Sequence, residues 1–354
     1  MMRKWGLVLM VFVLLGAPML ACGFPLPVGT TMLAVGKAVC AQGESVATCQ
    51  ARQDAYQAMN KLHSAAVGDL TMALYIDDGS QVTAANVAGS YEYVVTGEDT
   101  GLGANIHAVV TDGQVQSGDG SAPQVLTGME FIVYGDKGYS STDGGQTWTY
   151  EDLDSSALSG IGMLLGLGGA RGATLNLFSD PTVFKVTVDQ TVPIDGQMMN
   201  VQTLTLDLSA LLANADVMSG LLQQGTAAGG DLLNLSPEDL QAFNPQQIAM
   251  MSSILLPLFE GTELSTTLYI GQDDGYIHRV EDNYVLMMDL SKIDAQSKPI
   301  KMSYLLSGTI SQYNAELAIN VPQNATQGQG IFGQGGVFGG SGLGSTIFGG
   351  SSDP

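Results

Sequence analysis

Apolar and polar residues alternate through most of the middle of the chain. Between Asp69 and Asp77, the residues Leu70, Met72, Leu74 and Ile76 occupy every second position, and Tyr91, Tyr93 and Val95 repeat this spacing within residues 89–96. A period of two places such side chains on one face of a β-strand. The pattern predicts further strands at residues 105–111, 129–135, 138–141, 147–150, 183–188, 199–207, 264–271 and 276–288, and within 300–321. We therefore expect about ten or eleven strands, mostly antiparallel, because short Gly- and Asp-containing turns separate them.

A helical period occurs in fewer places. Residues 45–66 carry an apolar stripe that includes Val46, Ala55 and Met59, with Arg52 on the polar side. Residues 158–169 and an insert at about 209–259, in two pieces, are also expected to be helical. One leading helix and a helical insert, rather than a helix after each strand, predict an α+β fold.

The first residues are typical of an export signal. Arg3 and Lys4 precede an apolar run over residues 5–20, which is too short for a comfortable membrane span, and the run ends in Met19-Leu20-Ala21-Cys22. That ending resembles the lipobox of bacterial lipoproteins, in which the cysteine carries a diacylglycerol. We expect a signal peptide at 1–21, a lipid on Cys22 and a tether over 22–44; the alternative is an ordinary secretory signal with a chance cysteine.

Charge and cysteine content narrow the possible partners. The chain has 12 Lys and Arg against 34 Asp and Glu, and loss of Arg3 and Lys4 with the signal peptide would change its net charge from −22 to −24 (12 − 2 − 34). Nucleic acid and anionic headgroups repel such a surface, so we expect neither as a partner. If Cys22 takes a lipid, Cys40 and Cys49 remain as a pair, and an oxidising compartment favours a disulfide between them.

Motifs for catalysis or metal binding are scarce. Gly-x-Ser-x-Gly, His-Glu-x-x-His, phosphate-loop and Cys-x-x-Cys patterns are absent from the sequence, and His63, His107 and His278 fall in separate elements, His63 at the end of the first expected helix. The stretch at 141–148 fits a single Asp box, in which Asp143 caps a hairpin turn and Trp148 packs beneath it. The acidic pairs at 77–78, 273–274 and 281–282, interpreted as turns, lack the spacing of a dedicated calcium loop. We expect no enzymatic activity, no metal and no cofactor.

The C-terminal residues 323–354 are rich in Gly, Ser and Gln. They contain three apolar-Phe-Gly units, at 331–333, 337–339 and 347–349. Such a composition cannot bury enough apolar surface to fold alone, so we expect disorder. The alternative is that the Phe-Gly units contact a protein partner.

Three hairpins and a final strand carry a family resemblance. The hairpins are the Asp-Gly-Gly turn with its Trp at 139–148, the segment 192–207 that ends in Leu-Thr-Leu-Asp, and the Asp-Asp-Gly turn at 268–280; the final strand is 313–322. Together they resemble the LolA-like superfamily, in particular the LppX/LprG-type lipoproteins of the bacterial envelope. The resemblance covers residues 45–322, with 209–259 as a helical insert.

The resemblance implies a curved, unclosed half-barrel of antiparallel strands whose concave face is covered by helices, with an apolar cavity between them that accepts acyl chains or the lipid part of lipoproteins. Its candidate lining residues are Met72, Leu74, Ile76, Tyr91, Tyr93, Phe131, Val133, Val186, Val188, Leu204 and Leu206. The 17 methionines suit an unselective apolar ligand, although apolar strand faces also form ordinary cores.

The leading hypothesis is an extracytoplasmic, membrane-anchored lipoprotein, at the cell surface or in the periplasm, that binds or carries lipid or another apolar molecule. The alternative is a structural or interaction lipoprotein of the envelope with a filled core and a partner-binding Phe-Gly tail. An enzymatic role in glycan hydrolysis, suggested by the Asp box, is the third option.

Overall fold

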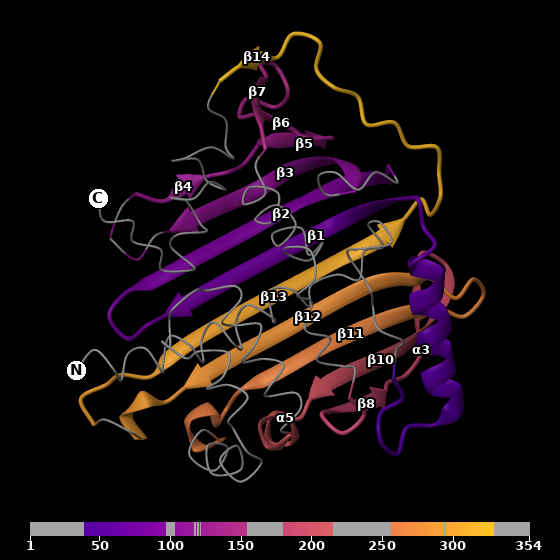
Figure 1. Ribbon diagram of the computed structural model, residues 1–354, viewed down its shortest axis with the longest axis vertical. Helices are drawn as coiled ribbons and strands as arrows, with labels where there is room; N and C mark the ends of the chain where they lie inside the picture. Colours follow the sequence, from indigo (N-terminus) through magenta and orange to yellow (C-terminus); the bar gives the residue numbers. More distant parts are fainter. Residues whose placement is uncertain are drawn as a thin grey trace, which may run out of the picture.

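One open β-sheet dominates the computed structural model, which describes residues 39–96, 103–116, 118, 120, 122–153, 180–214, 256–292 and 295–328. Its strand order is β14-β7-β6-β5-β3-β2-β1-β13-β12-β11-β10-β8, with β4 paired to β3 and β9 paired to β10 (Figure 1). The two outermost strands, β14 and β8, do not pair with each other, so the sheet is not a closed barrel. Strands β1 and β13 lie side by side although they stand at opposite ends of the described chain (Figure 1).

The strands vary from two to fourteen residues. They are β1 (Ser64–Asp77), β2 (Val82–Val95), β3 (Ala104–Gln116), β4 (Gln124–Val125), β5 (Glu130–Tyr134), β6 (Lys137–Ser141), β7 (Thr149–Asp152), β8 (Phe184–Val188), β9 (Val192–Ile194), β10 (Gln197–Leu206), β11 (Glu263–Gly271), β12 (Ile277–Met288), β13 (Ile300–Ser311) and β14 (Thr326–Gln327). The described helices are α3 (Val46–Met59), α5 (Leu208–Ala213) and the 3-10 turns η1 (Leu256–Phe259) and η2 (Leu290–Lys292).

The open, mostly antiparallel sheet predicted from the sequence is confirmed. Three of the fourteen strands, β4, β9 and β14, have two or three residues, and the other eleven correspond to the expected strands. The helix expected at 158–169 and most of the insert at 209–259 lie outside the described residues, so their covering of the sheet stays a prediction. Within the insert, α5 begins after Asp207, whose carboxylate accepts a hydrogen bond from the Ala210 backbone N–H at 3.1 Å.

Two β-bulges explain why the central strands are longer than their sequence pattern indicated. In β1 the register with β13 shifts between Gly68 and Thr71, and Asp69 adopts a positive φ of 47°. The extra residue keeps Ala65 and Val67 on the same face as Leu74, although they are out of phase with it in the sequence. A second shift separates Ala88 from Gly89, where an added Cβ would lie 2.1 Å from the Val109 carbonyl oxygen, so this position requires glycine.

The first helix is shorter than predicted. Ser45 caps α3 by accepting a hydrogen bond from the Thr48 N–H at 3.1 Å, and the helix ends at Met59. The expectation that it continues to Ala66 is wrong, because residues from Ser64 onward pair with β2. His63 therefore lies in the connection to β1 rather than at a helix end, and its backbone N–H donates to the Asn314 side chain at 2.9 Å.

The end of the sheet also differs from the expectation. Strand β13 stops at Ser311 because Gln312 and Asn314 have positive φ values of 53° and 55°, which no strand accommodates. The predicted strand at 313–322 is therefore irregular chain. It leads to β14, which pairs in parallel with β7 at the far edge of the sheet (Figure 1). The first residues of the expected disordered tail thus belong to the sheet, whereas 329–354 lie outside the described residues.

Candidate functional site

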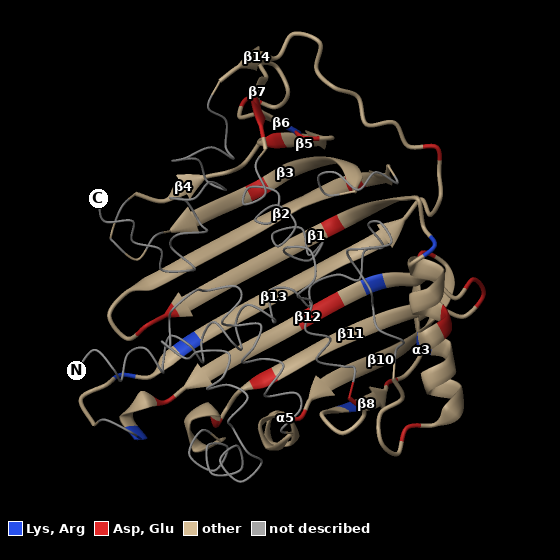
Figure 2. Ribbon diagram, viewed as in Figure 1, with Lys and Arg blue, Asp and Glu red and all other residues tan. Residues whose placement is uncertain are grey.

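The two faces of the sheet differ in chemistry. Helix α3 packs against β11 and β12, and we call the face on which it lies the inner face. Along β12 the inner positions Val280, Tyr284 and Leu286 are at most 3% exposed, whereas Arg279, Glu281 and Asn283 point to the opposite, outer face. Figure 2 shows that long stretches of the central strands carry neither acidic nor basic residues. The inner face is therefore a broad apolar surface that extends across neighbouring strands.

The predicted lining residues fall on this inner face. Seven of them are buried there, namely Leu74, Tyr91, Tyr93, Phe131, Val133, Leu204 and Leu206. Met72, Ile76 and Val186 are partly buried against the same core. Cross-strand pairing brings Leu74 opposite Tyr304, and Ala108 between Tyr91 and Phe131. Val188 differs, because it ends the edge strand β8 and is 59% exposed.

The sequence interpretation missed a polar cluster in the middle of the inner face. Asp282 on β12 is 2% exposed, and its Oδ1 lies within hydrogen-bond distance of Thr266 Oγ1, at 2.6 Å, and of Tyr284 OH, at 3.0 Å. The two hydroxyl groups are themselves 2.7 Å apart. Burial raises the pKa of Asp282 to about 7, although both hydrogen bonds favour the ionised form. The interpretation of residues 281–282 as a turn is wrong. Both residues belong to strand β12, in which Glu281 points outward and Asp282 inward.

Asp282 is exceptional for its position. Among the Asp, Glu, Lys and Arg residues of β3, β2, β1, β13, β12, β11 and β10, it is the one that the strand register places among the buried inner positions. The sequence contained one signal of this burial. Asp282 stands midway between Val280 and Tyr284, so the two-residue period of the strand places it on the same face as these two residues. Within the described part of the chain, its Oδ2 atom has no hydrogen-bond partner.

Tyrosines lie next to this cluster. The Tyr284 and Tyr304 rings are stacked with centroids 6.1 Å apart. Burial raises the pKa of Tyr304, and the nearby Asp282 adds to the effect. Burial also raises the pKa of Tyr93, whose OH is the other inner-face polar atom that finds no partner among the described residues. The inner face thus combines apolar side chains with two buried polar atoms that are free to bond.

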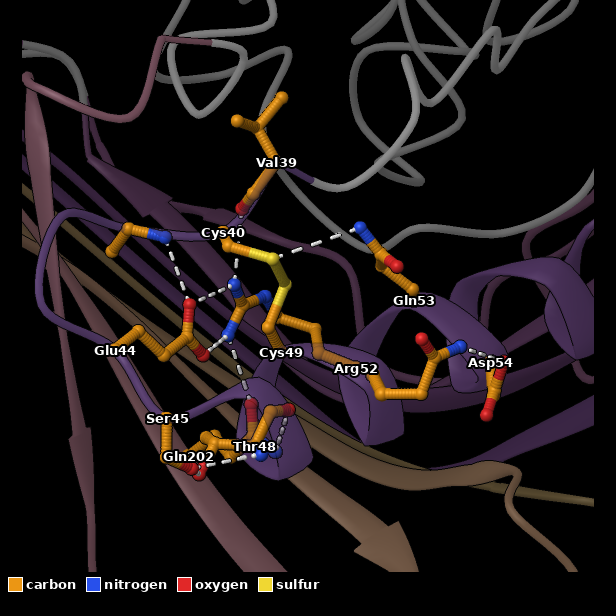
Figure 3. The surroundings of a disulfide bond; sticks show 12 residues. Val39, Cys40, Glu44, Ser45, Thr48, Cys49, Arg52, Gln53, Asp54 and Gln202 are labelled. Atoms are coloured by element: carbon orange, nitrogen blue, oxygen red, sulfur yellow. Dashed lines mark hydrogen bonds and ion pairs between the residues drawn. A yellow bond between two sulfur atoms is a disulfide. The ribbon is translucent and has the colours of Figure 1, made fainter.

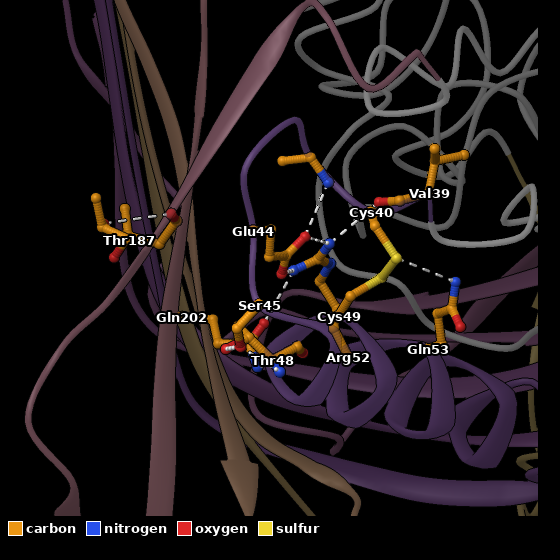
Figure 4. Close-up of polar contacts among 12 residues, drawn as sticks. Val39, Cys40, Glu44, Ser45, Thr48, Cys49, Arg52, Gln53, Thr187 and Gln202 are labelled. Carbon is orange, nitrogen blue, oxygen red and sulfur yellow. Dashed lines mark hydrogen bonds and ion pairs between the residues drawn. A yellow bond between two sulfur atoms is a disulfide. The ribbon is translucent and has the colours of Figure 1, made fainter.

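A second feature absent from the sequence interpretation fixes the N-terminal end of the domain. Arg52, assigned to the polar side of its helix, is 1% exposed, and its guanidinium binds both Glu44 carboxylate oxygens, at 2.5 and 2.8 Å (Figure 3). It also donates to Gln202 Oε1 on β10 and to the Val39 carbonyl, each at 3.1 Å. Gln202 in turn donates to the Thr48 carbonyl at 3.1 Å (Figure 4). This Arg52 cluster attaches residues 39–45 and α3 to the sheet.

The predicted disulfide lies beside the Arg52 cluster. Cys40 and Cys49 are joined, with their Cα atoms 5.2 Å apart and nine residues of sequence separation (Figure 3). The bond connects the incoming chain to the first turns of α3. Residues 1–38, which include the signal peptide and Cys22, lie outside the described residues.

The Asp-box stretch forms a structural turn, as expected. Asp143 Oδ1 accepts from the backbone N–H groups of Gln146 and Thr147 at 3.0 and 2.9 Å, and Oδ2 accepts from Thr147 Oγ1 at 2.6 Å. These bonds, led by that of the Thr147 hydroxyl, lower the pKa of Asp143 to about 2. Trp148 Nε1 donates to the Gly145 carbonyl at 2.9 Å. The carboxylate is fully engaged in the turn.

Other chemistry finds little support in the described ranges. They contain no group of three or more His, Cys, Asp or Glu side chains that could hold a metal ion. His107 and His278 lie on different strands, each near one carboxylate. Among the helices that the structure describes, none has the length and apolar character needed to cross a membrane.

Comparisons with known proteins give structural likenesses but no sequence match. No family model matches the chain, and no curated protein matches it. The structure is similar to the lipoprotein LppX of Mycobacterium tuberculosis (14% identity, 77% of this chain and 97% of LppX covered, TM-score 0.32) and to LprF of Mycobacterium bovis (15% identity, 78% and 96% covered, TM-score 0.37). It is also similar to a domain of Vibrio parahaemolyticus described as an outer membrane lipoprotein-sorting protein (9% identity, 76% and 93% covered, TM-score 0.22). At 9–15% identity these are likenesses of fold alone.

Proposed function

We propose that this protein is a membrane-anchored extracytoplasmic lipoprotein whose inner face binds lipid or another hydrophobic molecule. The observation that carries the proposal is the unequal chemistry of the sheet: its outer face is polar, whereas its inner face presents apolar and aromatic side chains from β3 across to β10. A surface of this kind excludes water well and lacks the charges that would select a soluble polar ligand.

The size of the inner face supports a ligand as part of its cover. Seven neighbouring strands from β3 to β10 are about 29 Å across at ~4.8 Å per spacing, and those of 12 to 14 residues are about 40–46 Å long at ~3.3 Å per residue. Helix α3, with 14 residues, is about 21 Å long and ~10 Å wide. It lies near β10, β11 and β12, so β1, β2 and β3 extend well beyond it. We propose that an apolar ligand contributes to the cover of these strands.

Ala108→Trp tests whether the inner face has room for a ligand. Ala108 lies on the inner face between Tyr91 and Phe131, and Val109→Trp on the outer face of the same strand is its matched control. We expect the unmodified protein to copurify with lipid in native mass spectrometry and, after delipidation, to bind Nile red saturably. Ala108→Trp should weaken that binding at least about tenfold with little change in melting temperature, since the indole occupies space meant for the ligand, while Val109→Trp should bind normally.

A filled core gives the opposite result. If the inner face is packed by the protein itself, the unmodified protein copurifies with no lipid and shows no saturable dye binding, and overpacking at Ala108 costs about 1–3 kcal/mol of stability. That outcome would favour the alternative of a structural lipoprotein that contacts a partner through its Phe-Gly tail.

The anchor is tested separately. Mass spectrometry of the intact protein from a bacterial membrane fraction should show that residues 1–21 are absent and that Cys22 carries acyl groups. The Cys22→Ala variant should leave the membrane fraction while retaining dye binding. A Cys22 that proves unmodified would contradict the anchor without affecting the binding proposal.

A further inference from the structure

Among the described strands from β3 to β10, Asp282 is the one acidic residue that faces inward, and no cation of the described chain pairs with it. The carboxyl of Asp282 faces Thr266 on β11 and Tyr304 on β13, with Leu306 directly opposite it across the β12–β13 pairing. No Lys, Arg or His of the described residues forms an ion pair or a hydrogen bond with it. A buried carboxylate without a cation is unfavourable, which indicates that the group holds its proton.

Counting hydrogens in the cluster leads to the same state. Asp282 Oδ1, Thr266 Oγ1 and Tyr284 OH form a triangle with sides of 2.6, 2.7 and 3.0 Å, each within hydrogen-bond distance. Three hydrogen bonds need three hydrogens, and the two hydroxyl groups supply only two. If the carboxylate were ionised, one of the three pairs of oxygen atoms would have no hydrogen between them, and their lone pairs would repel each other. A proton on Oδ1 closes the ring, with each oxygen donating once and accepting once.

This arrangement defines the chemistry of the other carboxyl oxygen. When Oδ1 carries the proton, Oδ2 is a carbonyl-type acceptor, and it is buried with no partner among the described residues. A buried unsatisfied acceptor is costly, and a ligand that brings a donor removes that cost. A ligand that brings only ether or ester oxygens leaves Oδ2 unpaired, and an ionised fatty-acid carboxylate brings a buried negative charge and no donor to the same apolar place.

We propose that Asp282 Oδ2 accepts a hydrogen bond from a hydroxyl or amide N–H group of an uncharged lipid bound on the inner face. The inference rests on the proposed function, because it requires the inner face to bind a lipid. It narrows the ligand class to neutral lipids that carry a hydrogen-bond donor next to a hydrocarbon chain.

The test compares two probes that differ in one donor. Oleyl alcohol and oleyl methyl ether have the same chain, and each can displace Nile red from the delipidated full-length protein. We expect the alcohol to bind about tenfold more tightly than the ether, because one otherwise unmade hydrogen bond to a buried acceptor is satisfied. In Asp282→Leu, which has no acceptor at this position, the two affinities should become equal within about twofold.

Tyr93→Phe is the matched control, since it removes the other unpartnered polar atom of the inner face and should leave the preference for the alcohol unchanged. Equal binding of both probes to the unmodified protein would overturn the Asp282 inference and leave lipid binding intact. A preference that survives in Asp282→Leu, or that disappears in Tyr93→Phe, would also overturn it. If neither probe displaces Nile red and the dye itself does not bind, the proposed function fails instead. Circular dichroism of each variant establishes that it is folded.

Discussion

Replacing Asp282 by Asn should change how stability depends on pH. Burial raises the pKa of Asp282 to about 7 in the folded protein, from an ordinary value of 3.8. Below the ordinary value both folded and unfolded chains hold the proton, and stability does not depend on this group. Between the two values only the folded chain holds it, so raising the pH favours the unfolded chain. The asparagine side chain does not titrate and has nearly the same size.

The magnitude follows from the size of the shift. Each unit of pKa difference corresponds to about 1.4 kcal/mol, and the shift from 3.8 to about 7 spans roughly three units, so the penalty reaches about 4 kcal/mol at pH 7 and above. The carboxyl is 2% exposed, and solvent therefore screens it little. A loss of this size is a large fraction of the ~5–15 kcal/mol that stabilises a typical domain.

Urea unfolding of delipidated protein, followed by tryptophan fluorescence at several pH values from 4 to 8, measures this effect. The difference in unfolding free energy between the unmodified protein and Asp282→Asn cancels all other titrating groups, including Asp207, whose pKa the Lys185 and Ser209 side chains lower. We expect the unmodified protein to lose about 4 kcal/mol relative to the variant as the pH rises from 4 to 7.5. A difference that stays constant, or that moves in favour of the unmodified protein as the pH rises, would refute a protonated Asp282.

Three further predictions concern the rest of the described chain. Arg52→Ala leaves Glu44 buried without a cation and should destabilise the protein by about 3–5 kcal/mol in urea unfolding. The double variant Arg52→Met with Glu44→Leu should recover most of this loss, and equal losses in both proteins would argue against the ion pair as the cause. Replacing both Cys40 and Cys49 by serine opens a loop of nine residues and should cost about 2–3 kcal/mol by the same measurement, so an unchanged urea midpoint would contradict it. Asp143→Ala should speed amide hydrogen exchange in the β6–β7 turn without altering Nile red binding, because its hydrogen bonds stay within the turn; slow exchange in the variant would show that other contacts hold the turn.

The sequence predicted the strands well because their signal is local. A buried face on each strand requires an apolar residue at every second position, and the segments around Leu74, Tyr91 and Leu204 show that spacing without reference to the rest of the chain. The bulge at Gly68–Asp69 removed the signal where the strand gains one residue, and residues 64–66 were assigned to the preceding helix. An extra residue in a strand is visible only when its partner strand is known.

The polar contacts could not be predicted, because they depend on pairing between distant segments. Arg52 meets Gln202 across 150 residues of sequence, and in a helical projection it lies with polar residues. Asp282 follows Glu281 and precedes Asn283, a composition typical of a turn, yet its burial depends on the β11 and β13 strands that flank it. Local composition carries no information about such partners, whereas spacing from Val280 and Tyr284 carried some.

Because β14 pairs in parallel with β7, the two ends of the described chain lie near opposite borders of the sheet. The described chain starts beside β10, where Arg52 holds Val39, and finishes beside β7, where the Gly328 N–H donates to the Tyr150 carbonyl. Nine strand spacings separate these two places, or about 43 Å measured along the sheet. If the proposed lipid on Cys22 holds the β10 border near a membrane, the chain leaves the sheet after Gly328 at the opposite border, about 43 Å away.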